Sequence, residues 1–129
     1  MTTRNGSSLF VVDSSGWVDY MAEGAKAEKY SAYIQQEQAL LLPTIALYEV
    51  YKKLLITRGE SLAERFHSHA LRTQVVSLDE RLALAAVAAS IEHRLAMADA
   101  IIYATAHAYQ AQLVTSDTHF QRLPGVTLI

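Results

Sequence analysis

Cysteine is absent from this sequence of 129 residues, which excludes disulfide bonds and thiolate metal sites. No apolar run approaches the roughly 20 residues of a membrane-spanning helix, and the polar start MTTRNGSS lacks the apolar segment of a secretion signal. We therefore expect a cytoplasmic protein that does not bind a membrane. Glycine-rich nucleotide-binding loops are also missing. The net charge of −2 argues against nucleic-acid binding over the whole surface, but it leaves room for a local basic patch.

The length and composition are those of one globular domain. A chain of 129 residues can bury roughly two thirds of its unfolded surface, so it can form a core without covalent cross-links. Hydrophobic residues make up 51% of the chain and charged residues 19%, which is ordinary for a globular protein. We expect a single domain over residues 8–129 and a flexible N-terminal tail at residues 1–7.

Short apolar runs alternate with helical patterns along the chain. This alternation is typical of a parallel sheet with helices on both faces. The predicted fold class is therefore α/β, a three-layer α/β/α sandwich with a central, mostly parallel five-stranded sheet. The predicted strands are 8–13, 39–43, 74–78, 111–117 and 126–129, and the predicted helices are 14–23, 26–38, 44–58, 61–72, one that follows Asp79, and 98–110.

Residues that stabilise helix starts precede three of these helices. Thr44 can cap the helix that Gly59 ends. The segment SLAE at 61–64 matches a capping box. Asp79 is placed to cap the alanine-rich helix that follows it.

Four acids occupy positions that a parallel sheet would bring together. Asp13 follows the run LFVV and Asp117 follows LVTS, so both lie at carboxyl ends of predicted strands, where such sheets bind ligands. Asp99 opens an apolar helix, and Glu49 lies within another helix. Taken singly, the aspartates could be helix caps, and Glu49 could form a surface pair with Lys53. The four acids together are harder to explain in this way.

A shared site for these acids implies a cation. Like charges a few ångströms apart raise each other's pKa, so several carboxylates stay ionised together only with a positive partner. Oxygen ligands without thiolates suit Mg²⁺ or Mn²⁺ rather than zinc. Such an ion can lower the pKa of a bound water and hold a phosphate group.

Four segments, in order and spanning nearly the whole chain, resemble the motifs of PIN-domain ribonucleases, most closely the VapC-type toxins of type II toxin–antitoxin systems. They are VVDSSGWVDY, TIALYEVYKK, LAMADAIIYATA and LVTSDTHF. The last of these is similar to the family's T-x-D/N-x-x-F block, with Thr115, Asp117 and Phe120. His119 departs from the pattern, because many relatives carry an acid immediately before that phenylalanine.

The resemblance implies a metal-dependent endoribonuclease that hydrolyses RNA phosphodiesters with a metal-activated water, leaving 5′-phosphate and 3′-hydroxyl ends. It implies that Asp13, Glu49, Asp99 and Asp117 hold one or two Mg²⁺ or Mn²⁺ ions, directly or through water. Ser14 and Thr115 are then expected to orient these carboxylates through hydrogen bonds. The implied partners are an RNA substrate, a cognate antitoxin protein and a second copy of the chain in a homodimer.

Other functions remain as alternatives. A receiver domain would need paired acids after the first strand and a lysine after the fifth, and a haloacid-dehalogenase phosphatase would need D-x-D where this chain has D-S-S. A PIN-like module that binds RNA or protein without turnover stays open, and so does a PIN nuclease that processes RNA outside a toxin–antitoxin system.

Two further patterns have both a structural and a functional interpretation. Basic residues on two neighbouring predicted helices could form a solvated face or contact RNA phosphates. The small-residue stretch 82–90 could serve close helix packing or a homodimer surface. The basic residues are Lys52, Lys53, Arg58, Arg65 and Arg72.

The histidines show no spacing typical of metal ligands.

Overall fold

The computed structural model describes residues 8–129, and the tail predicted for residues 1–7 lies outside this range. The α/β fold class is confirmed: five short strands alternate with six α-helices. The strands are β1 (Phe10–Val12), β2 (Leu41–Pro43), β3 (Gln74–Val76), β4 (Gln112–Thr115) and β5 (Val126–Leu128). The helices are α1 (Ser14–Met21), α2 (Ala27–Ile34), α3 (Thr44–Thr57), α4 (Glu60–Ala70), α5 (Glu80–His93) and α6 (Met97–Ala108), with single 3₁₀ turns at Glu37–Ala39 and Thr118–Phe120.

The strands are all parallel, in the order β3, β2, β1, β4, β5. In the register, Val12 lies opposite Val114, and Thr115 lies opposite Leu128. β2 and β3 pair separately, and an isolated parallel bridge between Phe10 and Leu40 joins the two groups. The predicted five-stranded sheet is thus a three-stranded and a two-stranded sheet that meet at one bridge.

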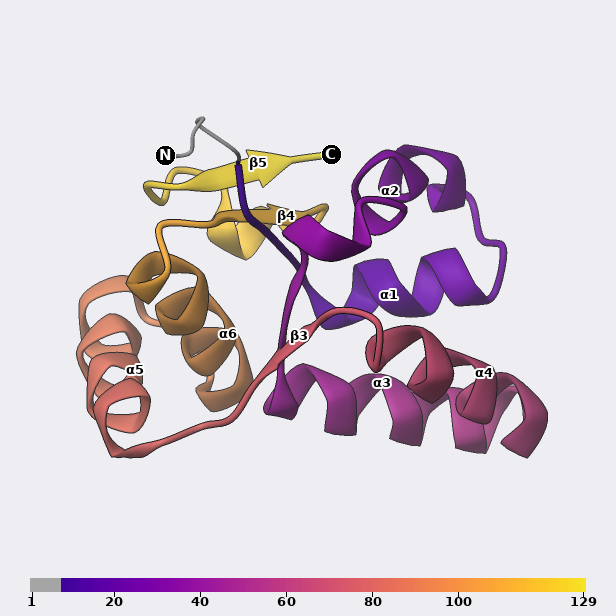
Figure 1. Ribbon diagram of the computed structural model, residues 1–129. Helices are drawn as coiled ribbons and strands as arrows, with labels where there is room; N and C mark the ends of the chain where they lie inside the picture. Colours follow the sequence, from indigo (N-terminus) through magenta and orange to yellow (C-terminus); the bar gives the residue numbers. More distant parts are fainter. Residues whose placement is uncertain (1–7) are drawn as a thin grey trace.

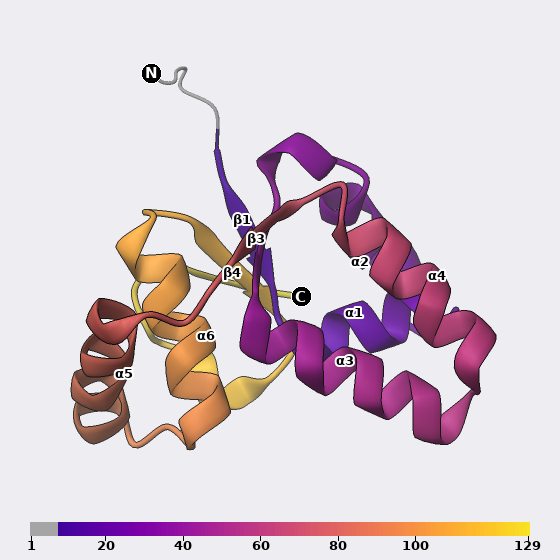
Figure 2. The same cartoon turned by 60° about the horizontal axis from the view of Figure 1, so that its bottom comes forward.

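Helices cover the strands on both sides, as the three-layer prediction requires. Figure 1 shows α5 and α6 on one side of the strands and α1 to α4 on the other. Figure 2, turned by 60°, keeps α5 and α6 together and apart from α3 and α4. The carboxyl ends of β1 and β4 therefore lie between two groups of helices.

The core explains why the elements pack in this order. Residues Ala100–Ala106 of α6 are all buried, as expected for a helix that is apolar nearly all round. On the other side, the fully buried Trp17 of α1 meets Phe66 of α4 edge to face, with 5.4 Å between ring centroids. This contact holds α1, which follows Asp13 directly, in a fixed position.

Two of the three predicted helix caps are wrong, and one is confirmed. Asp79 accepts a hydrogen bond from the Leu82 N–H at 2.9 Å and caps α5. Thr44 already lies inside α3, where its hydroxyl accepts from the Leu78 N–H at 3.3 Å. α4 begins at Glu60, before the predicted capping box, and Gly59 at φ 104° precedes it. An extended Pro43 precedes α3 and the positive-φ Gly59 precedes α4, and neither helix start has a side-chain cap.

No helix within residues 8–129 is both long enough and apolar enough to cross a bilayer.

Gly16 sets the distance between α1 and its neighbours. A Cβ atom added there would lie 2.5 Å from a Tyr30 ring carbon and 2.8 Å from a Val12 methyl carbon. We predict that Gly16→Ala lowers the free energy of unfolding. Overpacking costs about 1–3 kcal/mol and outweighs the helix-propensity gain of about 0.5–1 kcal/mol.

Urea denaturation measures this effect. The cost of Gly16→Ala should shrink in a Tyr30→Leu background, where the ring that the new methyl group meets has been removed. An unchanged urea midpoint for the single variant would contradict the close approach.

Candidate functional site

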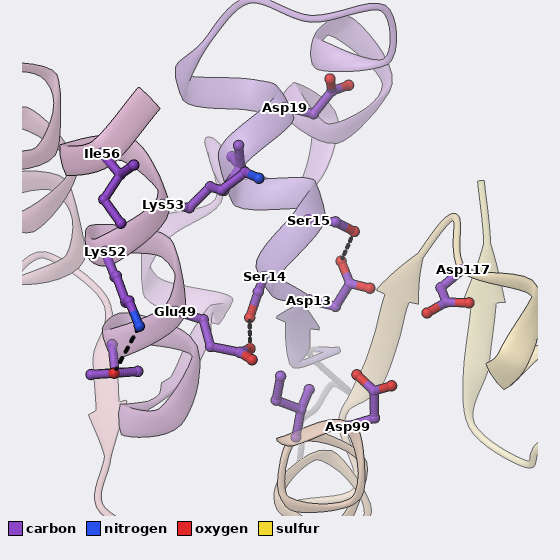
Figure 3. Close-up of a pocket in the computed structure, with 13 residues that line it drawn as sticks. Asp13, Ser14, Ser15, Asp19, Glu49, Lys52, Lys53, Ile56, Asp99 and Asp117 are labelled. Atoms are coloured by element: carbon purple, nitrogen blue, oxygen red, sulfur yellow. Dashed lines mark hydrogen bonds between the residues drawn. The ribbon is translucent and has the colours of Figure 1, made fainter. Parts of the chain in front are cut away.

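A pocket of about 600 Å³ opens at the carboxyl ends of β1 and β4, and all four predicted acids line it. Asp13 follows β1, Glu49 comes from α3, Asp99 from the first turn of α6, and Asp117 from the loop after β4. Figure 3 shows their carboxyl groups around the same opening. Residues separated by as many as 104 positions are thus brought together, as the parallel topology predicted.

Asp13 is the most constrained of the four acids. Its backbone N–H donates to the Val114 carbonyl at 3.1 Å, which continues the pairing of β1 with β4. The residue is 6% exposed, and its carboxylate accepts hydrogen bonds from the Gly16 N–H (3.0 Å), the Ser15 hydroxyl (3.0 Å) and the Thr115 hydroxyl (2.5 Å). Asp13 therefore caps α1, as its structural interpretation predicts, and it also lines the pocket.

Thr115 connects Asp13 to Asp117. While its hydroxyl donates to Asp13, the same oxygen accepts from the Asp117 N–H at 3.0 Å. Asp117 in turn caps the 3₁₀ turn at Thr118–Phe120 by accepting from the His119 N–H at 2.9 Å. One buried hydroxyl thus fixes the relative positions of two acids on adjacent segments, which agrees with the orienting role expected for Thr115.

Ser14 has the other predicted orienting contact. Its hydroxyl donates to Glu49 Oε1 at 2.6 Å and links the start of α1 to the middle of α3. The surface pair considered for Glu49 and Lys53 does not form, because Glu49 makes no ion pair among residues 8–129. Glu49 is half-buried and faces the pocket.

Asp99 has no role as a helix cap. α6 is preceded by Ala96, which makes no side-chain cap bond, and Asp99 lies within the first turn, half-buried and lining the pocket. The packing of α6 on the core does not require a carboxylate at position 99, because the side chain of Asp99 lines the pocket. The cap alternative for this residue is therefore wrong.

The pKa shifts show how closely the acids interact. Burial raises the pKa of Asp99, and the charges of Asp117, Glu49 and Asp13 raise it further, while His119 lowers it. Burial also raises the pKa of Asp13, an effect that its three hydrogen bonds oppose. The neighbouring negative charges are unfavourable for the ionised form of Asp99, so a cation in the pocket would relieve that cost.

The donor set fits a hard divalent cation, although it is not assembled around one point. All four side chains offer carboxylate oxygens, the ligands that Mg²⁺ and Mn²⁺ prefer. Within residues 8–129, however, no three acidic or histidine side chains come close enough together to form a ready-made metal site. Mg²⁺ usually keeps several of its waters and takes only one or two carboxylates directly. The separation of the acids is compatible with such partly hydrated binding.

Sequence reasoning missed several residues that line this pocket or contact its acids. Ser15 hydrogen-bonds Asp13, and Asp19 lies on the rim with one oxygen accepting from the Lys26 N–H at 2.7 Å. His119 Nδ1 lies 3.0 Å from Asp117 Oδ1, an ion pair when the imidazole is protonated. The SSGWVDY segment could have indicated Ser15 and Asp19, because both follow Asp13 on the first helix. His119 contacts Asp117 within the short turn at Thr118–Phe120, which Asp117 caps.

Of the five basic residues grouped from the sequence, only Lys52 and Lys53 line the pocket. Arg72 pairs with Glu37 at 2.8 Å, and Arg58 donates to the Ala22 carbonyl at 3.3 Å. Arg65 lies in a separate depression with Arg72. The five residues do not form one continuous basic face.

Comparison with known proteins supports the architecture. A family model described as PIN domain matches residues 10–126. A toxin–antitoxin complex from Klebsiella pneumoniae contains a similar fold, with a TM-score of 0.77 and 24% identity over 94% of this chain and 96% of that chain. VapC20 of Mycobacterium tuberculosis, described as a Sarcin-Ricin loop cleaving toxin, has a TM-score of 0.75 and 17% identity over 91% of this chain and 96% of that chain.

A third similar structure is VapBC from Salmonella typhimurium bound to DNA, with a TM-score of 0.73 and 15% identity over 95% of this chain and 98% of that chain. No curated protein matches the sequence significantly. At these identities the structural likenesses show the fold.

We predict that Asp99→Asn leaves the metal-free protein equally or more stable at neutral pH. The folded-state pKa of Asp99 is raised above 3.8. The stability linked to its protonation is therefore fully present below the unfolded pKa and lost as pH rises through the folded pKa. The amide cannot ionise, so it retains that stability at neutral pH. Thermal unfolding in chelator, followed from acidic to neutral pH, measures the difference.

Asp13→Ala provides the contrast. This variant removes a helix cap worth about 0.5–2 kcal/mol and leaves the buried Thr115 hydroxyl without its acceptor. It should therefore unfold at lower temperature than the unaltered chain. If Asp99→Asn were as destabilising as Asp13→Ala, Asp99 would have a structural role that its contacts do not show.

Proposed function

The chain belongs to the PIN domain family, and we propose on that premise that it is a metal-dependent endoribonuclease, the toxin of a toxin–antitoxin pair. The observation that carries the proposal is the convergence of Asp13, Glu49, Asp99 and Asp117 on one pocket at the carboxyl ends of parallel strands. The proposed substrate is RNA. Hydrolysis would transfer a water oxygen to phosphorus and release the 3′-hydroxyl.

The four carboxylates are the groups that would hold one or two Mg²⁺ or Mn²⁺ ions, directly or through water. A bound ion would lower the pKa of a water and neutralise charge on the phosphate. The protein's own contribution is to keep acceptor oxygens in place. Thr115, Ser15 and the Gly16 N–H hold Asp13, and Ser14 holds Glu49. Three of these four donors lie in α1, so one helix organises half of the site.

A toxin of this kind requires a partner that closes the pocket, and we propose a cognate antitoxin protein. Two of the similar structures are described as a toxin–antitoxin complex and as DNA-bound VapBC. A basic side chain from the antitoxin would pair with Asp13, Asp99 and Asp117 and compete with the metal for them. Arginine fits better than lysine, because its planar fork matches a carboxylate.

We also propose that the chain forms a homodimer through α5. Leu84, Val87 and Ile91 are exposed to 64%, 55% and 77% on this helix, and Met97 beside them is exposed to 72%. An apolar depression between α5 and α6 runs along the same surface. Apolar side chains grouped in this way mark interaction sites in soluble proteins. A second copy of the chain would bring two such surfaces together.

We predict that purified chain cleaves RNA in Mg²⁺ or Mn²⁺ and not in excess chelator. The RNA panel should include single-stranded and stem–loop substrates, and product ends should be mapped as 5′-phosphate and 3′-hydroxyl. Asp99→Asn should lose cleavage by about 100-fold or more, because it removes charge from the proposed metal site, while remaining folded. Equal cleavage with and without chelator would contradict metal dependence.

The toxin role has its own readout in cells. Expression of the chain should arrest growth, and Asp99→Asn, as well as co-expression of the cognate antitoxin, should relieve the arrest. Cleavage in vitro without arrest in cells would favour a nuclease that processes RNA outside a toxin–antitoxin pair. No cleavage across the panel would favour a binding module without turnover.

We predict that light scattering after size exclusion gives twice the 14.3 kDa mass of one chain. Ile91→Lys should halve that mass, because it places a charge in the proposed dimer surface. The matched control is Ile56→Lys, which alters an equally exposed isoleucine (71%) on α3 and should leave the dimer intact. A monomer for the unaltered chain would remove the dimer proposal.

A further inference from the structure

One wall of the acidic pocket is chemically unlike the rest. Tyr48, Lys52, Lys53 and Ile56 line it from α3, at positions i, i+4, i+5 and i+8, which lie along one side of a helix. Figure 3 shows Lys52, Lys53 and Ile56 on this helix, across the pocket from Asp99 and Asp117. We refer to these four residues as the α3 wall.

The apolar parts of the α3 wall are left uncovered. Tyr48 is 60% exposed and Ile56 is 71% exposed, although both are large side chains next to a concave site. Lys52 Nζ lies 5.6 Å from the centre of the Tyr48 ring and 3.5 Å from its hydroxyl oxygen. The ring and the ammonium group thus form one exposed unit at the edge of the pocket.

The lysines are the only positive side chains that line the pocket in the described part of the chain. Neither of them forms an ion pair among residues 8–129. Asp19, across the pocket, adds to the negative charge of the four site acids. A polyanion approaching this pocket is repelled by the acids, so the two lysines are where its phosphates would be attracted.

We propose that the α3 wall binds an unpaired stretch of RNA beside the acids, with one base stacked on Tyr48, a second nucleotide packed against Ile56, and the phosphates at Lys52 and Lys53. The inference rests on the proposed function and extends it to the side chains that recognise the RNA. An exposed aromatic ring can stack only on a base that has left its duplex, whereas lysines alone would bind single and double strands alike.

A protein segment fits this wall less well. The acids of the pocket would attract a basic peptide, but Lys52 and Lys53 would repel it along the α3 side. RNA satisfies both parts of the surface, because each nucleotide carries an apolar face and a negative phosphate.

The test uses the full chain carrying Asp99→Asn, so that bound RNA is not cut, with fluorescence anisotropy in chelator. The probes are a labelled single-stranded RNA and the same strand annealed to its complement. Tyr48→Ala should weaken single-strand binding by about 5- to 150-fold, the loss expected for one base stack, and should change duplex binding little. Tyr48→Phe, which keeps the ring, should restore the affinity.

The lysines have a separate readout in the salt dependence. Lys52→Ala with Lys53→Ala should reduce the slope of log affinity against log salt by about 0.7 for each lysine. The matched control is Lys29→Ala with Arg81→Ala, which removes the same charge from exposed positions on α2 and α5. That control should leave the slope unchanged.

Four results would overturn the proposal: no RNA binding, tighter binding of the duplex, equal affinities with and without the Tyr48 ring, or Tyr48-dependent binding of a basic peptide in place of RNA. Cleavage by the chain with intact acids separates this inference from the proposed function. Cleavage in Mg²⁺ with an unchanged KM for Tyr48→Ala would remove the α3 wall and keep the nuclease. Binding that depends on Tyr48 without any cleavage would do the reverse.

Discussion

Four carboxylates share one partly buried pocket, and the need to hold them there against burial and mutual repulsion constrains the structure around the pocket. The pKa of Asp99 is raised by burial and by the charges of Asp117, Glu49 and Asp13. Keeping Asp99 ionised beside these charges costs folding free energy, so the surrounding structure must hold the acids in place. The hydrogen bonds that Asp13 accepts, and the bond from Ser14 to Glu49, provide that restraint. A cation would convert the same arrangement from a cost into a binding site.

The position of α3 gives the pocket two kinds of surface. Glu49 joins the acids, while Tyr48, Lys52, Lys53 and Ile56 lie on the neighbouring side of the same helix. Its remaining side chains anchor it, since Ala46, Val50 and Leu54 are fully buried. A rigid helix thus sets the distance between Glu49, one of the proposed metal-binding acids, and the surface proposed to bind a nucleotide. Precise spacing of this kind is easier to maintain on a packed helix than on a loop.

Particular residues show how far sequence reasoning reached. The strand tips were predictable, because Asp13 and Asp117 directly follow apolar runs, and hydrophobic patterns locate strands well. The helix starts were less predictable. Thr44 and Ser61 look like caps, but α3 and α4 begin earlier, after Pro43 and Gly59. Local capping preferences contribute about 1 kcal/mol, so the packing of the helices on the core decides where each one begins.

By itself, the sequence determined the α/β class, which follows from periodicity, and the family and its four acids, which follow from the resemblance of four motifs in their order along the chain. Only the tertiary structure decided which basic residues face the pocket, that Thr115 bridges Asp13 and Asp117, and that the five strands meet through a single bridge. The physical reason is range: hydrophobic patterns act over a few residues, whereas these contacts join segments up to 102 positions apart.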